Sequence, residues 1–102
     1  MPELYGLHGR FVATPGGGDA LVDLLLDASG GLADMEGCLL YVISRDPDDR
    51  DSVWITEVWT NRAAHDASLE NGRVRETIRR ARPLIAAMSD SKELVPVGGK
   101  GI

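Results

Sequence analysis

Cysteine, histidine and large aromatic side chains are scarce in this chain. Its 102 residues include one cysteine, two histidines, two tryptophans, two tyrosines and one phenylalanine. The single cysteine, Cys38, excludes an internal disulfide and a cysteine-rich metal site, and we interpret it as a small buried apolar residue. The histidines, His8 and His65, lack the spacing of a helical metal-ligand pair. The sequence therefore predicts no metal site.

Long apolar segments and a leader are also missing. The apolar runs are far shorter than the roughly 20 residues that a membrane-spanning helix needs. The first residues show no charged segment followed by an apolar one, the pattern of a signal peptide. We therefore expect a soluble protein of the cytoplasm that does not bind a membrane.

Basic charge is in deficit overall, with a net charge of -5 and an isoelectric point near 4.8. This balance argues against a nucleic-acid partner, because phosphate recognition depends on a basic surface. Five arginines nevertheless gather in one segment: Arg73, Arg75, Arg79, Arg80 and Arg82. Because they alternate with apolar positions, we interpret them as the solvated face of a helix. An anionic ligand or a subunit contact is the alternative.

The length of the chain limits it to one domain. With 43% apolar residues, 102 residues can form one modest core. We place this core at residues 4–97 and expect 98–102, which are rich in glycine, to be a flexible tail. A small core makes assembly into oligomers favourable.

The alternation of apolar patterns and turn residues predicts the element order β-α-β-β-α-β. Asp19 is expected to cap the first helix, Asn61 or Thr60 the second, and Asn71-Gly72 to end the second. Pro83 is expected to bend the helical segment that follows. The expected strands are 4–13, 38–43, 53–60 and 92–97, with an acidic loop at 45–51, and the expected helices are 20–33, 62–69 and 74–88.

This order is the split βαβ, or ferredoxin-like, plan of α+β proteins. Four strands form an antiparallel sheet with the helices on one face. The other face would carry Trp54, Thr56 and Val58, which are too apolar to remain in water. We therefore expect a second copy of the chain to cover that face in a homodimer.

Glu57, Trp59 and His65 form the most informative group. Glu57 and Trp59 lie two residues apart in an expected strand and so share one of its faces. Burying a lone carboxylate costs several kcal/mol or shifts its pKa, so Glu57 needs a partner or a pocket. His65 follows at the start of a helix, and an imidazole suits proton transfer near neutral pH. The alternatives are an ion pair of Glu57 with a helix arginine, Trp59 as plain core, and His65 as a surface or interface residue.

Several short motifs together resemble the antibiotic biosynthesis monooxygenase family, whose members are dimeric α+β barrels. The resemblance spans about Tyr5 to Val97. The order and spacing of the motifs support the resemblance, because each motif alone is weak evidence for the family. The motifs are Gly37-Cys38-Leu39 with Tyr41, Arg45-Asp46-Pro47, Glu57-Val58-Trp59, Ala64-His65-Asp66-Ala67 and Leu69.

The resemblance implies oxidation of a quinol-like or polycyclic phenolic molecule by dioxygen without metal, flavin or haem. The substrate pocket would lie between the sheet and the helices. A base, an aromatic wall and a polar group for oxygen suffice for this chemistry. The catalytic residues would be His65 and Glu57. The substrate-binding residues would be Trp59, His8, Arg10, Tyr41, Leu69 and Arg73.

Some of these residues have a second interpretation or depart from the family. His8 and Arg10 share a strand face, which looks either into the pocket or toward the partner subunit. Tyr41 supplies a hydroxyl or is core. Arg73 stands where many members have a histidine, and Leu69 stands where the haem-degrading branch has its haem-ligating histidine. Haem degradation is therefore disfavoured.

Two other functions use the same fold. In one, Glu57 and His65 shuttle protons in a non-oxidative isomerase that acts on a small carbonyl compound. In the other, the chain is a non-catalytic ligand-binding dimer, as the missing histidine at Arg73 suggests. Turnover without oxygen would identify the isomerase, and a dry apolar pocket would favour the binding protein.

Overall fold

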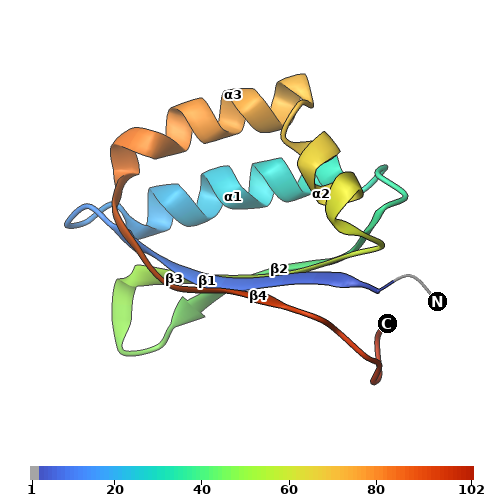
Figure 1. The fold of residues 1–102 in the computed structure, drawn as a ribbon. Coiled ribbons are helices and arrows are strands. Elements are labelled where there is room, and N and C mark those ends of the chain that lie inside the picture. The colour runs from blue at the N-terminus through green and yellow to red at the C-terminus, as the bar shows by residue number, and fades with distance from the viewer. Residues whose placement is uncertain (1–2) are drawn as a thin grey trace.

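The computed structural model describes residues 3–102. Four antiparallel strands form one sheet in the order β2-β3-β1-β4, and the helices cover one of its faces (Figure 1). The predicted ferredoxin-like α+β plan is therefore confirmed. The elements are β1 (Tyr5–Ala13), α1 (Gly18–Leu32), β2 (Cys38–Asp46), β3 (Asp49–Trp59), α2 (Arg62–Ser68), α3 (Gly72–Ala81), the 3-10 helix η1 (Arg82–Leu84) and β4 (Ile85–Leu94).

The register between β1 and β3 determines which side chains face the helices. Leu7 lies opposite Glu57, Phe11 opposite Val53, and Tyr5 opposite Trp59. Because side chains alternate along a strand, this set shares the face that the helices cover. Their direct neighbours along each strand, such as His8, Arg10, Trp54 and Thr56, belong to the other face.

The β2–β3 hairpin is longer than the sequence indicated. A loop was predicted at 45–51, but the strands run to Asp46 and resume at Asp49, which leaves a two-residue turn. The Asp46 carboxylate accepts a hydrogen bond from the Asp48 amide at 2.9 Å. Arg45 and Arg50 on the two strands both pair with Asp19 of α1, at 3.0 and 2.9 Å. Arg45 and Arg50, which were interpreted as part of a loop, therefore form ion pairs with a helix.

The start of α1 also differs from the prediction. Asp19 was expected to cap the helix, but Gly17 is the cap residue and has no side-chain bond. The Asp51 carboxylate instead accepts hydrogen bonds from the amides of Gly16 and Gly18, at 3.1 and 2.9 Å. A side chain at Gly18 would collide with the Arg50 carbonyl, so the hairpin approaches the helix only because this residue is glycine.

Asn71 begins α3 and does not end the helix before it. Its side-chain oxygen accepts from the amides of Arg73 and Val74 at 3.0 and 3.1 Å. The predicted C-terminal signal at Asn71-Gly72 is therefore wrong. Asn61 caps α2, as predicted, by accepting from the Ala64 amide at 2.7 Å.

The helix predicted over 74–88 stops at Ala81. Pro83 lies in η1, and the chain then enters β4, which pairs with β1 from Ile85 to Leu94. The strand predicted at 92–97 is correct only for its first residues. Pairing with the free edge of β1 overrides the helical propensity of the Ala86 and Ala87 region.

The core lies between the sheet and the helices, in two groups of buried residues. One group centres on Leu21, Val53 and Ile55, and the other joins Trp59 to Leu32 and Val74. Trp59 and Leu21 are among the largest fully buried side chains. The two groups flank the cavity described below.

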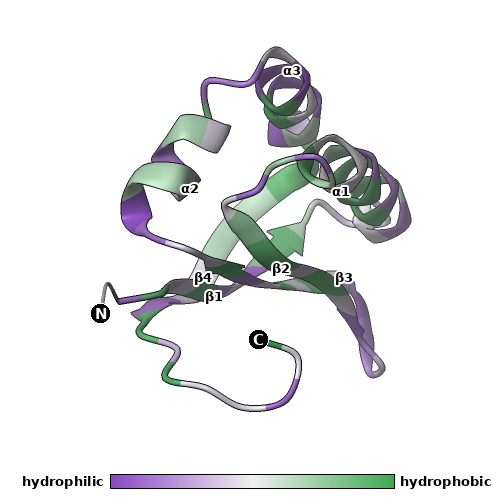
Figure 2. Ribbon diagram, turned by 90° about the vertical axis from the view of Figure 1, so that its right-hand side faces the viewer, coloured by the Kyte–Doolittle hydropathy of each residue, from purple (hydrophilic) through white to green (hydrophobic). Residues whose placement is uncertain are grey.

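The other face of the sheet carries no helix. Trp54 and Thr56 lie there and are half-buried. After β4 the chain turns beneath this face (Figure 2), where Pro96 packs against Gly6. The single-domain boundaries, the flexible tail and the location in the cytoplasm stay predictions. In the described part of the chain, no helix has the length and apolar character needed to cross a membrane.

Candidate functional site

A cavity of about 350 Å³ lies between the helix-covered face of the sheet and helices α1, α2 and α3. This size falls in the range of small-molecule sites, and most of the lining is apolar. The polar groups are few and come from β2, β3 and the helical layer. They are Tyr41, Glu57, Trp59, His65, Ser68, Thr77 and Arg82.

Glu57 and Trp59 lie side by side on one face of β3, as the two-residue period predicted. The indole Nε1 of Trp59 donates a hydrogen bond to Glu57 Oε1 at 3.0 Å. Trp59 is 1% exposed, whereas its neighbour Glu57 keeps 15% of its side chain exposed. Trp59 is therefore both a core residue and a wall of the cavity, and its N–H fixes the carboxylate.

His65 reaches the same carboxylate from α2. Its Nε2 lies 4.0 Å from Glu57 Oε1, and its Nδ1 lies 3.2 Å from Asp66 Oδ1. The ring meets Trp59 edge-on, with centroids 5.6 Å apart, and the Tyr5 ring lies 5.2 Å away. The Asn61 cap places the first turn of α2 so that His65 points back over the sheet. A carboxylate and an imidazole from two elements are thus brought close together.

Burial raises the pKa of Glu57 above that of an ordinary carboxyl group. The Trp59 N–H bond and the charge of His65 act in the opposite direction but are weaker. A carboxylate with a raised pKa is a stronger base than an exposed one, because it holds the proton that it takes. The site therefore favours proton transfer to Glu57.

Tyr41 faces the same cavity from β2, directly opposite Glu57 in the sheet register. Burial first, then the Glu57 carboxylate and Cys38, raise the pKa of its phenol far above the ordinary value. The hydroxyl therefore stays protonated and is available as a hydrogen-bond donor to a ligand. Burial and Glu57 likewise raise the pKa of Cys38, which disfavours a thiolate.

Leu69 lines the cavity as predicted, but Arg73 does not. The Arg73 guanidinium pairs with Asp27 at 3.0 Å and lies over Gly30 of α1, and its stem packs against Gly31. The side chain therefore joins α3 to α1. It is not the counterpart of a pocket histidine in this structure.

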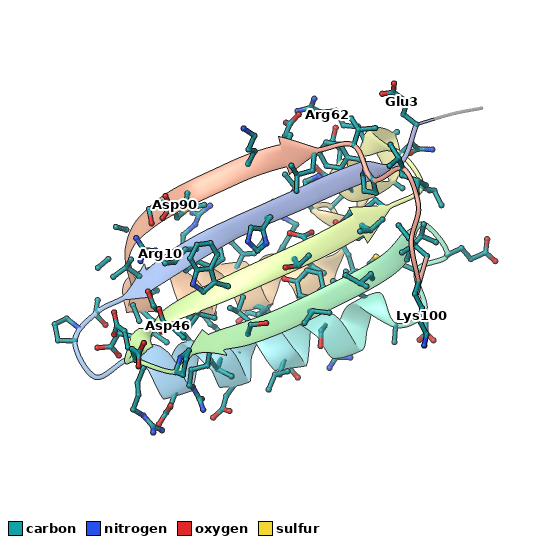
Figure 3. The ribbon with its side chains drawn as sticks, turned by 90° about the horizontal axis from the view of Figure 1, so that it is seen from below. Glu3, Arg10, Asp46, Arg62, Asp90 and Lys100 are labelled. Atoms are coloured by element: carbon teal, nitrogen blue, oxygen red, sulfur yellow. The ribbon has the colours of Figure 1, made fainter. Side chains whose placement is uncertain are left out.

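His8 and Arg10 lie on the opposite face of the sheet. His8 Nδ1 is 2.9 Å from Thr56 Oγ1, and its ring stacks on Trp54. Arg10 pairs with Asp90 at 3.1 Å, and both lie on the uncovered face in Figure 3. The physical reason is the alternation along β1: Leu7 and Phe11 face the helices, so His8 and Arg10, each next to one of them, face away. Both border only a smaller hollow of about 120 Å³ beside the β1–β4 bulge.

The sequence interpretation missed Ser68, Thr77 and Arg82 as cavity residues. Thr77 belongs to the apolar stripe of α3, with Val74 and Ala81, and all three are buried. That spacing could have placed Thr77 on the inner face. Arg82 could not be found, because the predicted helix continued past it.

No three His, Cys, Asp or Glu side chains within residues 3–102 come together in a group that could hold a metal ion.

Comparison with known proteins shows similarity to one family over most of the chain. The family model for antibiotic biosynthesis monooxygenase matches residues 4–80. A candidate antibiotic biosynthesis monooxygenase from Chloroflexus aurantiacus is 48% identical, with a TM-score of 0.90, over 97% of this chain and 98% of that one. A search among curated proteins found no match.

More distant structures share the fold. A protein from Pseudomonas aeruginosa is 21% identical with a TM-score of 0.85, over 96% of this chain and 98% of that one. A second candidate antibiotic biosynthesis monooxygenase, from Caulobacter crescentus, is 17% identical with a TM-score of 0.85, over 95% of this chain and 92% of that one.

Proposed function

Because the chain belongs to the antibiotic biosynthesis monooxygenase family, we propose that it oxidises a quinol-like or polycyclic phenolic molecule with dioxygen and without a bound cofactor. The observation that carries this proposal is the pair of Glu57 and His65 at the wall of an apolar cavity. A base, an aromatic wall and a proton donor are enough for this chemistry.

In the proposed reaction, the Glu57 carboxylate takes the acidic proton of the bound substrate. The electron-rich anion gives one electron to dioxygen, and the two radicals combine through a carbon–oxygen bond. The O–O bond of the resulting hydroperoxide then breaks with loss of water. For an anthrone, one oxygen atom becomes the new carbonyl and the other leaves in water, so the substrate supplies all four electrons.

Trp59 and Tyr41 position the reacting groups in this scheme, and His65 is the proton donor. Trp59 holds the Glu57 carboxylate through its N–H and offers a wall to the substrate. His65 returns the proton to the departing oxygen, since its Nε2 faces the same carboxylate. The Tyr41 hydroxyl donates to a substrate oxygen. These polar groups argue against a dry cavity that only binds ligands.

The test is oxygen dependence. Protein treated with a chelator should consume dioxygen with an anthrone and release the quinone, one dioxygen for each product. Glu57→Gln should lower kcat about 10²–10⁴-fold, the usual contribution of a general base, whereas Glu36→Gln at an exposed position outside the cavity should not. Equal turnover of a carbonyl substrate under anaerobic conditions would instead identify the isomerase.

We also propose that the chain forms a homodimer through the uncovered face of the sheet. Val42 and Leu94 on that face are 45% and 46% exposed, and the half-buried Leu40 and Trp54 lie on the same face, on β2 and β3. A row of this kind over a whole sheet face is unfavourable in water. A second copy would cover it with the same residues.

A further inference from the structure

The cavity has two chemically different ends. Glu57 pairs with Leu7 in the sheet, whereas Ile85, at the other end of the lining, pairs with Ala13. Six residues of strand separate these positions, or about 20 Å. The side of α3 that lines the cavity runs between the same two ends (Figure 1). The acid/base pair lies at one end, and Arg82 lies at the other.

Arg82 differs from the other arginines of its segment. Arg73 pairs with Asp27, and Arg75 and Arg79 pair with Glu70 and Glu76. Arg80 does not line the cavity. Within residues 3–102, Arg82 is the one arginine or lysine that lines the cavity, and no acidic group of this part of the chain pairs with it.

The backbone around Arg82 is fixed. Its amide donates to the Ile78 carbonyl as the last bond of α3, and its own carbonyl accepts from the Ile85 amide. Pro83 restricts the next φ angle, and the Leu84 carbonyl accepts from the Thr14 amide at 2.8 Å. The side chain therefore starts from a rigid corner where the cavity opens into a groove along α3.

From this arrangement we infer that the substrate carries an oxyanion, such as a carboxylate, that binds Arg82 while its reactive ring lies against Trp59 and Glu57. The inference rests on the proposed function and adds the substrate class. A guanidinium binds a carboxylate through two parallel N–H bonds, which fixes orientation as well as charge. The buried Glu57 carboxylate disfavours an anion at the other end, so the two ends together set one orientation.

Binding of two matched probes tests this inference without turnover. The probes are anthraquinone-2-carboxylate and its methyl ester, which differ in charge at one end. Because the Arg82 side chain is exposed to solvent, its ion pair is screened, and we expect the carboxylate to bind about two- to fivefold more tightly than the ester. The preference should decrease as salt is added.

Arg82→Ala should remove the preference and leave the affinity for the ester unchanged. Arg80→Ala, the control, should keep the preference of the parent chain, and the melting temperatures of both variants confirm folding. Arg82→Gln serves as a second variant if the alanine chain unfolds. An unchanged preference in the Arg82 variant, or equal binding of both probes to the parent, would overturn the inference. Oxygen uptake with a neutral anthrone would still support the proposed function.

Discussion

At the scale of single residues, the site depends on a carboxylate in an apolar setting. Glu57 has one hydrogen-bond donor, the Trp59 indole, and an imidazole at 4.0 Å. Burial nevertheless dominates and raises its pKa, so the ionised form lowers the stability of the folded state. Residues of this kind are retained where chemistry needs them, and they lower stability.

Replacement of this carboxylate by an amide should therefore stabilise the protein near neutral pH. The folded-state pKa of Glu57 lies above its unfolded value, so its contribution to stability is full at low pH and is lost as pH rises through the folded pKa. The amide side chain carries no charge, and its oxygen can still accept from Trp59. We expect Glu57→Gln to melt at a higher temperature than the parent at pH 7.

The difference in melting temperature should shrink as pH falls below the range of ordinary carboxyl groups, where Glu57 is protonated in both states. Glu36→Gln, at an exposed site, gives the baseline for a neutralised carboxylate. A Glu57→Gln chain that melts below the parent at pH 7 would mean that the ionised carboxylate stabilises the fold.

At the scale of elements, the helices depend on caps that lie outside their own apolar patterns. The Asn71 oxygen satisfies two amides of the first turn of α3. Without this acceptor, those N–H groups must turn to water. The cap thus determines where α3 starts, and with it the position of the buried stripe that lines the cavity.

Asn71→Ala should lower the free energy of unfolding by about 1 kcal/mol, the typical contribution of such a cap. Urea denaturation measures this loss. Asn71→Asp, which keeps the acceptor at the same position, should retain most of the stability. If alanine and aspartate lower the free energy equally, the side-chain oxygen does not cap the helix.

The residues in and around α3 show how far the sequence could predict the fold. Apolar periodicity and turn residues indicated the order of strands and helices along the chain, and the residue type indicated a cap at Asn61 or Thr60, because those signals are local. Asn71 was misread because asparagine is favoured both before a helix and after one. Ile85 continues the helical spacing of Val74 and Ile78, and only pairing with β1 makes it a strand.

The candidate site was predictable to the same degree. A two-residue period places Glu57 and Trp59 together, but it does not say which face of β1 meets the helices. His8 and Arg10 were therefore predicted to face either the pocket or the partner subunit. The apolar side chains of Leu7 and Phe11 indicate that their own face of β1 meets the helices, and that His8 and Arg10 face away from them. The role of Ser68 depends on tertiary packing and has no local signal. Arg82 was predicted only as one of five clustered arginines, with a solvated helix face as the interpretation and an anionic ligand or a subunit contact as the alternative.

At the scale of the whole molecule, the sheet separates two surfaces with different tasks. One face carries the cavity, and the other carries exposed apolar residues with the polar pair of Arg10 and Asp90 at its rim (Figure 3). A monomer would leave the second face in water. The same alternation that places Glu57 in the cavity therefore supports the proposed dimer.

Val42→Glu should convert the proposed dimer into a monomer. Val42 is exposed in one chain, so a charge there costs little within the monomer but would be buried without a partner in the dimer. Light scattering after size exclusion should give twice the 11.0 kDa chain mass for the parent and the chain mass for the variant. Leu26→Glu, at a 52% exposed position on α1, should stay dimeric. A monomeric parent would contradict the interface.

The central claim is that the pair of His65 and Glu57 performs oxidation by dioxygen in this cavity. The most direct measurement is oxygen uptake with an anthrone by the parent chain and by His65→Ala, with folding of both verified by circular dichroism. The account predicts that uptake by the folded variant falls about 10²-fold or more, as for loss of an acid/base group. A folded His65→Ala chain that consumes oxygen as fast as the parent would contradict it.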